Sequence, residues 1–138
     1  MKRLFLLAIL ACLLPSLLPA QGSDYKVVFD LTSKDTVDQQ NVLRWVAAIS
    51  KDYPEAQMEI VFYGQSLALV TKGKSVNPGA VASLASNKNV SFRVCSIAMK
   101  KHELTPNDLI EGVGTVPDGI YELVLKQHAG WGYIKVSH

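Results

Sequence analysis

Apolar and polar side chains alternate along residues 90–94, which read Val-Ser-Phe-Arg-Val, and the pattern ends at Cys95. A period of two is typical of a β-strand, and the alanine, methionine and lysine that follow favour a helix. Cys95 is therefore predicted to lie where a strand ends and a helix begins. Ligands bind at the carboxyl ends of strands in open α/β sheets, and a helix amino terminus favours a thiolate over a thiol. The pattern indicates Cys95 as a candidate nucleophile, and Lys100 and Lys101 would strengthen this effect if they fold back.

Similar patterns along the rest of the chain predict four more strands, with helices between them. The strands are expected at residues 25–31, 58–63, 113–116 and 131–136. Helices are expected at residues 36–53, 78–86 and 118–128 and after Cys95, with a short helix at residues 105–108. Residues 65–70 are expected to be a short helical or irregular crossover. Two helix starts carry capping signals, a capping box at residues 36–39 and an asparagine before a proline at residues 77–78. The alternation predicts a three-layer α/β/α sandwich with a mostly parallel five-stranded sheet, a Rossmann-like architecture.

The amino terminus has the plan of a secretory signal peptide. Lys2 and Arg3 precede an apolar run at residues 4–14, and small residues follow up to Ala20. We therefore expect residues 1–20 to be a signal peptide and residues 21–138 to be a single domain. Prolines interrupt the apolar run, which is already shorter than the roughly 20 residues that a membrane-spanning helix needs. The mature protein is expected to be periplasmic or secreted, without a membrane anchor.

Removal of that segment changes the charge and cysteine arguments. The whole chain has 14 basic and 12 acidic residues, but Lys2 and Arg3 would leave with the signal peptide. A charge-balanced mature chain without a basic run gives no reason to expect nucleic acid or an anionic lipid surface as a partner. The dinucleotide-binding motif GxGxxG does not follow the first predicted strand, and the P-loop motif GxxxxGK[ST] does not occur in the chain. No nucleotide or other cofactor is therefore expected. Cys12 also leaves, and Cys95 then has no intramolecular disulfide partner.

Four stretches of the chain resemble the DsrE/DsrF-like family, also called YchN-like, and in particular its exported members. They are Val61–Leu67, Asn89–Cys95 with Met99 following, Leu109–Val113 and Val116–Ile134. The resemblance implies a DsrE-like fold and a homo-oligomer, trimer or hexamer. It also implies that Cys95 carries sulfur as a persulfide.

Around Cys95, we expect Tyr63, Gly64, Ser96 and Met99 to bind the substrate. Many relatives have a histidine where this chain has Tyr63. A phenol does not replace imidazole as a base near neutral pH, so an acid–base role is not carried over to that position.

Persulfide transfer would make the protein a sulfurtransferase or a sulfur-relay carrier, with sulfur donor and acceptor proteins as its partners. Such transfer needs an accessible thiolate, and Cys95 is the one cysteine of the mature chain. A cysteine hydrolase would need a neighbouring histidine as its base. The spacing of His102, His128 and His138 from Cys95 does not match a dyad motif, which argues against hydrolysis.

Two non-enzymatic functions remain open from the sequence. The first is a ligand-binding or oligomeric interaction module in which Cys95 is a structural, buried side chain. The second is a Cu(I) site, because Cys95, Met99 and His102 have spacings of i, i+4 and i+7 and carry soft ligand atoms. Metal binding is the weaker expectation, because methionine at helical spacing usually fills a core. Trp131 and Tyr133 are expected either in the core or at a subunit interface.

Overall fold

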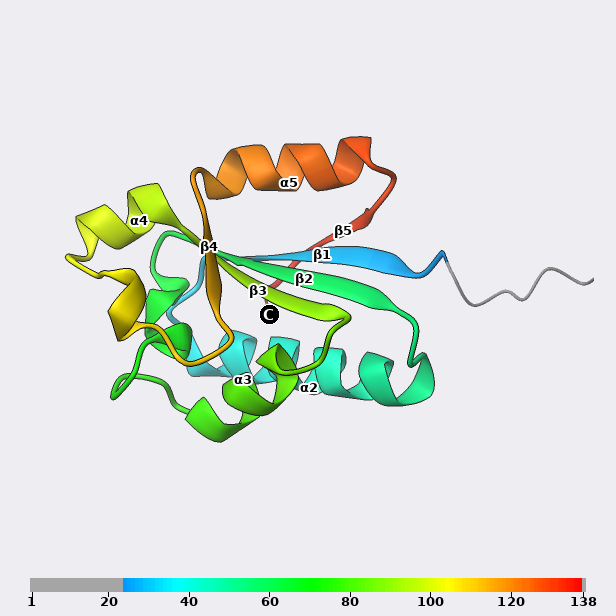
Figure 1. Cartoon of the computed structure of the whole chain (residues 1–138), viewed down its shortest axis with the longest axis horizontal. Helices are drawn as coiled ribbons and strands as arrows, with labels where there is room; N and C mark the ends of the chain where they lie inside the picture. Colours follow the sequence, from blue (N-terminus) through cyan, green and yellow to red (C-terminus); the bar gives the residue numbers. More distant parts are fainter. Residues whose placement is uncertain (1–23, 138) are drawn as a thin grey trace, which may run out of the picture.

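Five parallel strands form one sheet in the computed structural model, which describes residues 24–137 (Figure 1). The strands are β1 (Lys26–Leu31), β2 (Gln57–Phe62), β3 (Val90–Cys95), β4 (Gly114–Val116) and β5 (Gly132–Lys135). Their order across the sheet is β4-β3-β2-β1-β5, and every neighbouring pair is parallel. The predicted α/β fold with a parallel five-stranded sheet is confirmed. The proposed signal peptide, residues 1–20, lies outside the described residues.

In the described part of the chain, four α-helices connect and cover these strands. They are α2 (Thr36–Asp52), α3 (Pro78–Ala85), α4 (Ser96–Lys101) and α5 (Gly119–His128), with 3₁₀ turns η2 (Ser66–Val70) and η3 (Pro106–Asp108). Figure 1 shows α2 and α3 on one side of the sheet and α5 on the other, with α4 at the carboxyl end of β3. Among residues 24–137, no helix combines the length and the apolar character needed to cross a bilayer.

The helix starts follow capping chemistry, with one correction to the sequence interpretation. In α2 the cap is Asp35, whose Oδ1 accepts a hydrogen bond from the Val37 N–H at 2.7 Å. The predicted capping box at residues 36–39 is wrong, because Thr36 is already the first helical residue and cannot also be the cap. In α3 the expected cap is present, since Asn77 Oδ1 accepts from the Ala80 N–H at 3.2 Å.

The main hydrophobic core lies between the sheet and the α2–α3 layer. Phe29, Ile60 and Phe92 occupy one row across β1, β2 and β3 and are at most 1% exposed. The other face of the sheet has a small apolar cluster of Val28, Val61 and Leu123, under α5. Charged side chains flank this second cluster. The candidate site lies beyond it, at the carboxyl ends of the strands.

Candidate functional site

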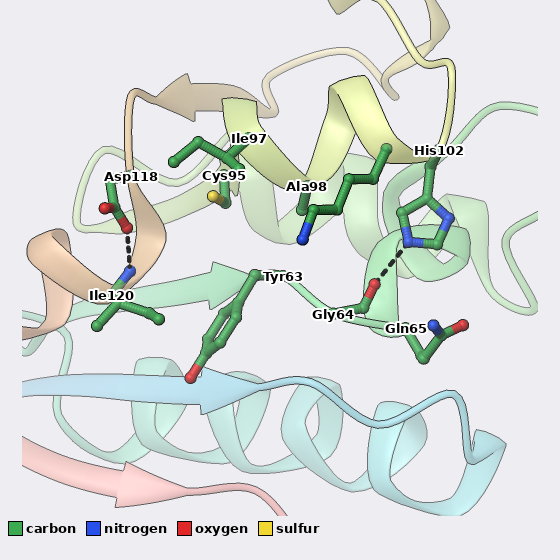
Figure 2. Close-up of a pocket in the computed structure, with 10 residues that line it drawn as sticks. Tyr63, Gly64, Gln65, Cys95, Ile97, Ala98, His102, Asp118 and Ile120 are labelled. Carbon is green, nitrogen blue, oxygen red and sulfur yellow. Dashed lines mark hydrogen bonds between the residues drawn. The ribbon is translucent and has the colours of Figure 1, made fainter.

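Cys95 occupies the predicted corner between a strand and a helix. It is the last residue of β3 and the cap residue of α4, with φ −65° and ψ 119°. Its sulfur makes no capping hydrogen bond to the α4 backbone. Figure 2 shows the sulfur turned into the space between α4, Tyr63 and the start of α5. The residue is only 5% exposed, and it lines a pocket at this end of the sheet.

A pocket of about 470 Å³ lies at this end of the sheet. It combines the turn after β2, the exposed length of α4 and the first turn of α5. Its lining residues are Tyr63, Gly64, Gln65, Cys95, Ile97, Ala98, Lys101, His102, Asp118 and Ile120. The pocket is large enough for a small ligand, and it lies where ligands bind in parallel α/β sheets.

The start of α5 lies directly against Cys95. A Cβ atom at Gly119 would be 3.0 Å from the Cys95 Cβ and 3.2 Å from Val61 Cγ1. Glycine therefore permits a close approach that any larger residue would disturb. Asp118 caps this helix, because its Oδ1 accepts from the N–H groups of Ile120 at 2.9 Å and Tyr121 at 3.3 Å. Cys95 thus lies beside the amino ends of two helices, α4 and α5.

Tyr63 forms the floor of the pocket beside Cys95. Its hydroxyl points toward β1 in Figure 2, away from the cysteine sulfur. Burial, followed by the nearby Asp30 carboxylate, raises the pKa of Tyr63 well above its ordinary value. The phenol is therefore protonated at neutral pH and cannot act as a general base there.

A polar network lies behind Tyr63, on the edge strand β5. Asp30 is buried and accepts hydrogen bonds from the Tyr133 hydroxyl at 2.6 Å and from Lys135 Nζ at 3.1 Å. This hydrogen bond to Asp30, with some burial, raises the pKa of Tyr133 to about 12. Lys135 also donates to Thr32 Oγ1 at 2.8 Å. The network satisfies the buried Asp30 carboxylate and joins β5 to β1.

His102 closes the far end of the pocket. Its Nε2 donates to the Gly64 carbonyl oxygen at 2.6 Å, which ties the end of α4 to the turn after β2 (Figure 2). Gly64 adopts a φ of +64°, a left-handed conformation that favours glycine at this turn. Cys95 and His102 therefore bound α4 at opposite ends, and both line the same pocket.

The structure separates the four residues that were predicted to bind substrate around Cys95. Tyr63 and Gly64 line the pocket with it, whereas Ser96 and Met99 line a smaller recess of about 140 Å³ on the other side of α4. Met99 is also a member of the main hydrophobic core. The cause is the helical period, which turns consecutive residues of α4 to different sides.

The two neighbouring lysines also separate, since Lys101 lines the pocket and Lys100 lines the recess.

The three residues proposed for a Cu(I) site do not come together. Cys95 and His102 line the pocket, but Met99 lies on the other side of α4 in the core. Within residues 24–137 there is also no group of three or more histidine, cysteine, aspartate or glutamate side chains placed to hold a metal ion. The arrangement therefore places Cys95 and His102 at one pocket without Met99.

Several pocket residues were not predicted from the sequence. Gln65, Ile97 and Ala98 belong to segments that were recognised, but their side chains were not assigned to the site. Asp118 and Ile120 come from α5, which follows the edge strand β4. The parallel pairing of β4 with β3 is the signal that could have predicted these residues. Because Val116 of β4 pairs with Cys95 of β3, the residues that follow β4 must lie at the same edge of the sheet as Cys95.

Three solved structures have the same fold. MTH1491 from Methanobacterium thermoautotrophicum, a protein of unknown function, is 28% identical, has a TM-score of 0.75, and the match covers 81% of this chain and 99% of that one. The ychN protein from E. coli is 14% identical, with a TM-score of 0.67 and coverage of 80% and 97%. BT1422 from Bacteroides thetaiotaomicron, a conserved protein of unknown function, is 14% identical, with a TM-score of 0.68 and coverage of 85% and 99%.

The second and third similarities carry the fold alone, because their identities are low. No curated protein matches the chain. The DsrE/DsrF-like family model matches residues 26–136, which include every strand and helix described above. By that match the chain belongs to the DsrE/DsrF-like family.

Proposed function

We propose that the protein is exported and carries sulfur as a persulfide on Cys95, as a sulfurtransferase or a sulfur-relay carrier. The observation that supports this most directly is the orientation of the Cys95 sulfur into a pocket of about 470 Å³ at the carboxyl end of the sheet. The resemblance of the surrounding sequence to sulfur-trafficking relatives agrees with this placement. Fractionation of cells that express the full chain tests export, with recovery of a shortened protein outside the cytoplasm as the expected result.

The surroundings of Cys95 favour the chemistry that such a carrier needs. The sulfur must be a thiolate to attack the outer sulfur of a donor, and it must later present that sulfur to an acceptor thiol. Lys101 lines the same pocket and provides a positive charge that an anionic donor can contact.

Intact-mass measurement tests the carrier function. After incubation with a sulfane donor, the protein is expected to gain a mass of roughly 32 Da, one sulfur atom, on its cysteine. The adduct should disappear in Cys95→Ser and should be released by a reducing thiol. Absence of any adduct across donors of different size and charge would contradict the proposal.

Exposed apolar residues support a homo-oligomer. Ile120, Tyr121, Val124 and Leu125 lie on one face of α5 and are 41–61% exposed, while Tyr133 of β5 is 44% exposed. Tyr133 is therefore not a core residue, which leaves the interface alternative for this position. Light scattering after size exclusion should give a mass two or more times that of one chain. Leu125→Glu should reduce that mass by placing a charge in the interface, whereas Glu111→Lys, on a distant exposed loop, should not.

The second candidate function is a binding or interaction module in which Cys95 is inert. It is favoured by the low exposure of Cys95 and by its packing within the main hydrophobic core. This alternative predicts slow alkylation of Cys95 in the native protein, at a rate close to that of a buried thiol. Alkylation that is faster than that of a free thiol at neutral pH would exclude it.

A further inference from the structure

The pocket around Cys95 has an uneven distribution of charge. Its sulfur end is lined by Ile97, Ile120 and Asp118, and its other end by His102 and Gln65 (Figure 2). The Asp118 carboxylate already accepts two backbone N–H groups at the start of α5. The charge at the sulfur end is therefore balanced by the helix that it caps.

Lys101 is the cation of this pocket without a carboxylate partner. Among residues 24–137, the ion pairs involve Lys126 and Lys135, and neither Lys101 nor Asp118 takes part in one. Lys101 ends α4, whereas Cys95 caps its beginning, so their Cα atoms lie on the order of 9 Å apart along the helix axis. A long lysine side chain shortens the distance between its ammonium group and the sulfur.

The depth of the sulfur limits what can reach it. Cys95 is 5% exposed, and the surrounding pocket has room for a small molecule. A cysteine fixed on the surface of a folded protein would have to enter the pocket past Ile97 and Ile120 to reach Cys95. A small thiol is not limited in this way. An inorganic sulfur anion would use the lysine but leave the apolar walls without a contact.

We infer that the sulfur donor at Cys95 is a low-molecular-weight thiol persulfide that carries a carboxylate, which Lys101 binds while the terminal sulfur meets Cys95. This inference rests on the proposed carrier function and names its substrate class. In the transfer, the Cys95 thiolate attacks the terminal sulfur of R–S–SH. The new Sγ–S bond forms as the S–S bond of the donor breaks, and R–S⁻ leaves. The products are Cys95–S–SH and R–S⁻, so sulfur, charge and protons balance without an external oxidant or reductant.

Two donors that differ only in the carboxylate test this inference. Cysteine persulfide and cysteamine persulfide have the same reactive group, and only the first can pair with Lys101. The initial rate of formation of the Cys95 sulfur adduct, followed by intact mass at low donor concentration, should be about tenfold higher with cysteine persulfide. This ratio is the order expected for one charge-assisted hydrogen bond.

Neighbouring lysines provide the matched variants. Lys101→Met should reduce the ratio of the two rates to about one, whereas Lys100→Met, which changes a lysine on the opposite side of α4, should leave it unchanged. Equal rates with the two donors in the wild type, or a preference that survives Lys101→Met, would overturn the inference and leave the carrier function standing. If neither donor nor any other sulfane donor modifies Cys95, the carrier function itself fails.

Discussion

The two faces of the sheet use the same three central strands for different purposes. Toward α2 and α3, the row of Phe29, Ile60 and Phe92 is apolar and buried. Toward α5, the neighbouring row holds Asp30 and Arg93 on either side of Val61. Because side chains alternate along a strand, neighbouring residues point to opposite faces of the sheet, one to the apolar core and the next to the charged side chains. The α2–α3 face therefore holds most of the buried apolar side chains, while the α5 face holds buried charge and packs against Cys95.

The second buried carboxylate on the α5 face, Glu59, has one cation as its partner. Glu59 is 3% exposed, and its Oε2 pairs with Lys126 Nζ at 2.8 Å. Lys126 also lies 4.3 Å from the centre of the Trp131 ring and 3.6 Å from Glu122 Oε1. Glu59 Oε1 has no hydrogen-bond partner. Burial exceeds the attraction of Lys126, and the pKa of Glu59 is therefore raised above its ordinary value.

The largest expected effect lies on the apolar face. Phe62 is fully buried and stacks on Phe92 with ring centroids 5.7 Å apart. Phe62→Ala should lower the free energy of unfolding by about 3–5 kcal/mol, because it leaves a cavity in the main core. Denaturant titration measures this change. If Phe62→Ala lowers the free energy of unfolding by less than Lys126→Met does, the α2–α3 face does not contribute more to stability than the α5 face.

Removal of the cation from the α5 face should have the next largest effect. Lys126→Met leaves the buried Glu59 carboxylate without its partner and should cost about 2 kcal/mol, below the full range for a wholly buried pair, because Lys126 is partly exposed. The double variant Glu59→Leu with Lys126→Met should recover most of this loss. A double variant as unstable as the sum of both single changes would show that the two residues are not coupled.

Gly119→Ala tests how closely the start of α5 packs against Cys95. The new methyl group would contact Cys95 and Val61, so the start of α5 must shift by a few tenths of an ångström. We expect a loss of about 1 kcal/mol in unfolding free energy and a changed rate of Cys95 alkylation. Gly79→Ala, which has open space around it in α3, is the matched control. It should leave the alkylation rate unchanged and should not lower the unfolding free energy, because alanine favours a helix more than glycine does.

The smallest expected effect is the pH dependence that Glu59 contributes. A carboxyl group whose pKa is raised on folding stabilises the protein below its ordinary pKa of 4.5, and this contribution is lost as the pH rises through the folded value. Glu59→Gln removes the contribution. The difference in unfolding free energy between variant and wild type should therefore move in favour of the variant as the pH rises from 4.5. A constant difference across that window would contradict the raised pKa.

The fold could be predicted from the sequence because its signals are local. Alternation in residues 90–94 and the capping residue Asn77 specify their own elements, and the order of elements then specifies a parallel sheet. The boundaries differ by one or two residues, as at β4, where the strand begins at Gly114 rather than residue 113.

The site could be predicted only in part because half of it is not local. Cys95 ends one strand and Gly64 closely follows another, and the alternation of apolar and polar residues predicted both strands. The two residues were therefore expected at one edge of the sheet, where they line the same pocket. Asp118 reaches the same pocket through the pairing of β4 with β3, which no short motif encodes. Met99 was placed near Cys95 by an i, i+4 spacing, but Cys95 is a cap residue with extended dihedrals, and the helical spacing does not begin until Ser96.

The pairing of β5 with β1 has a consequence for the order of folding. The hydrogen bond between Tyr133 and Asp30 joins residues 103 positions apart, and it forms on the strand that lies second from the edge. Nearly the entire chain must therefore be available before the first strand acquires its second neighbour. Contacts of such long sequence separation are slow to form, so a nascent chain would hold β1 with one open flank until its final segment arrives.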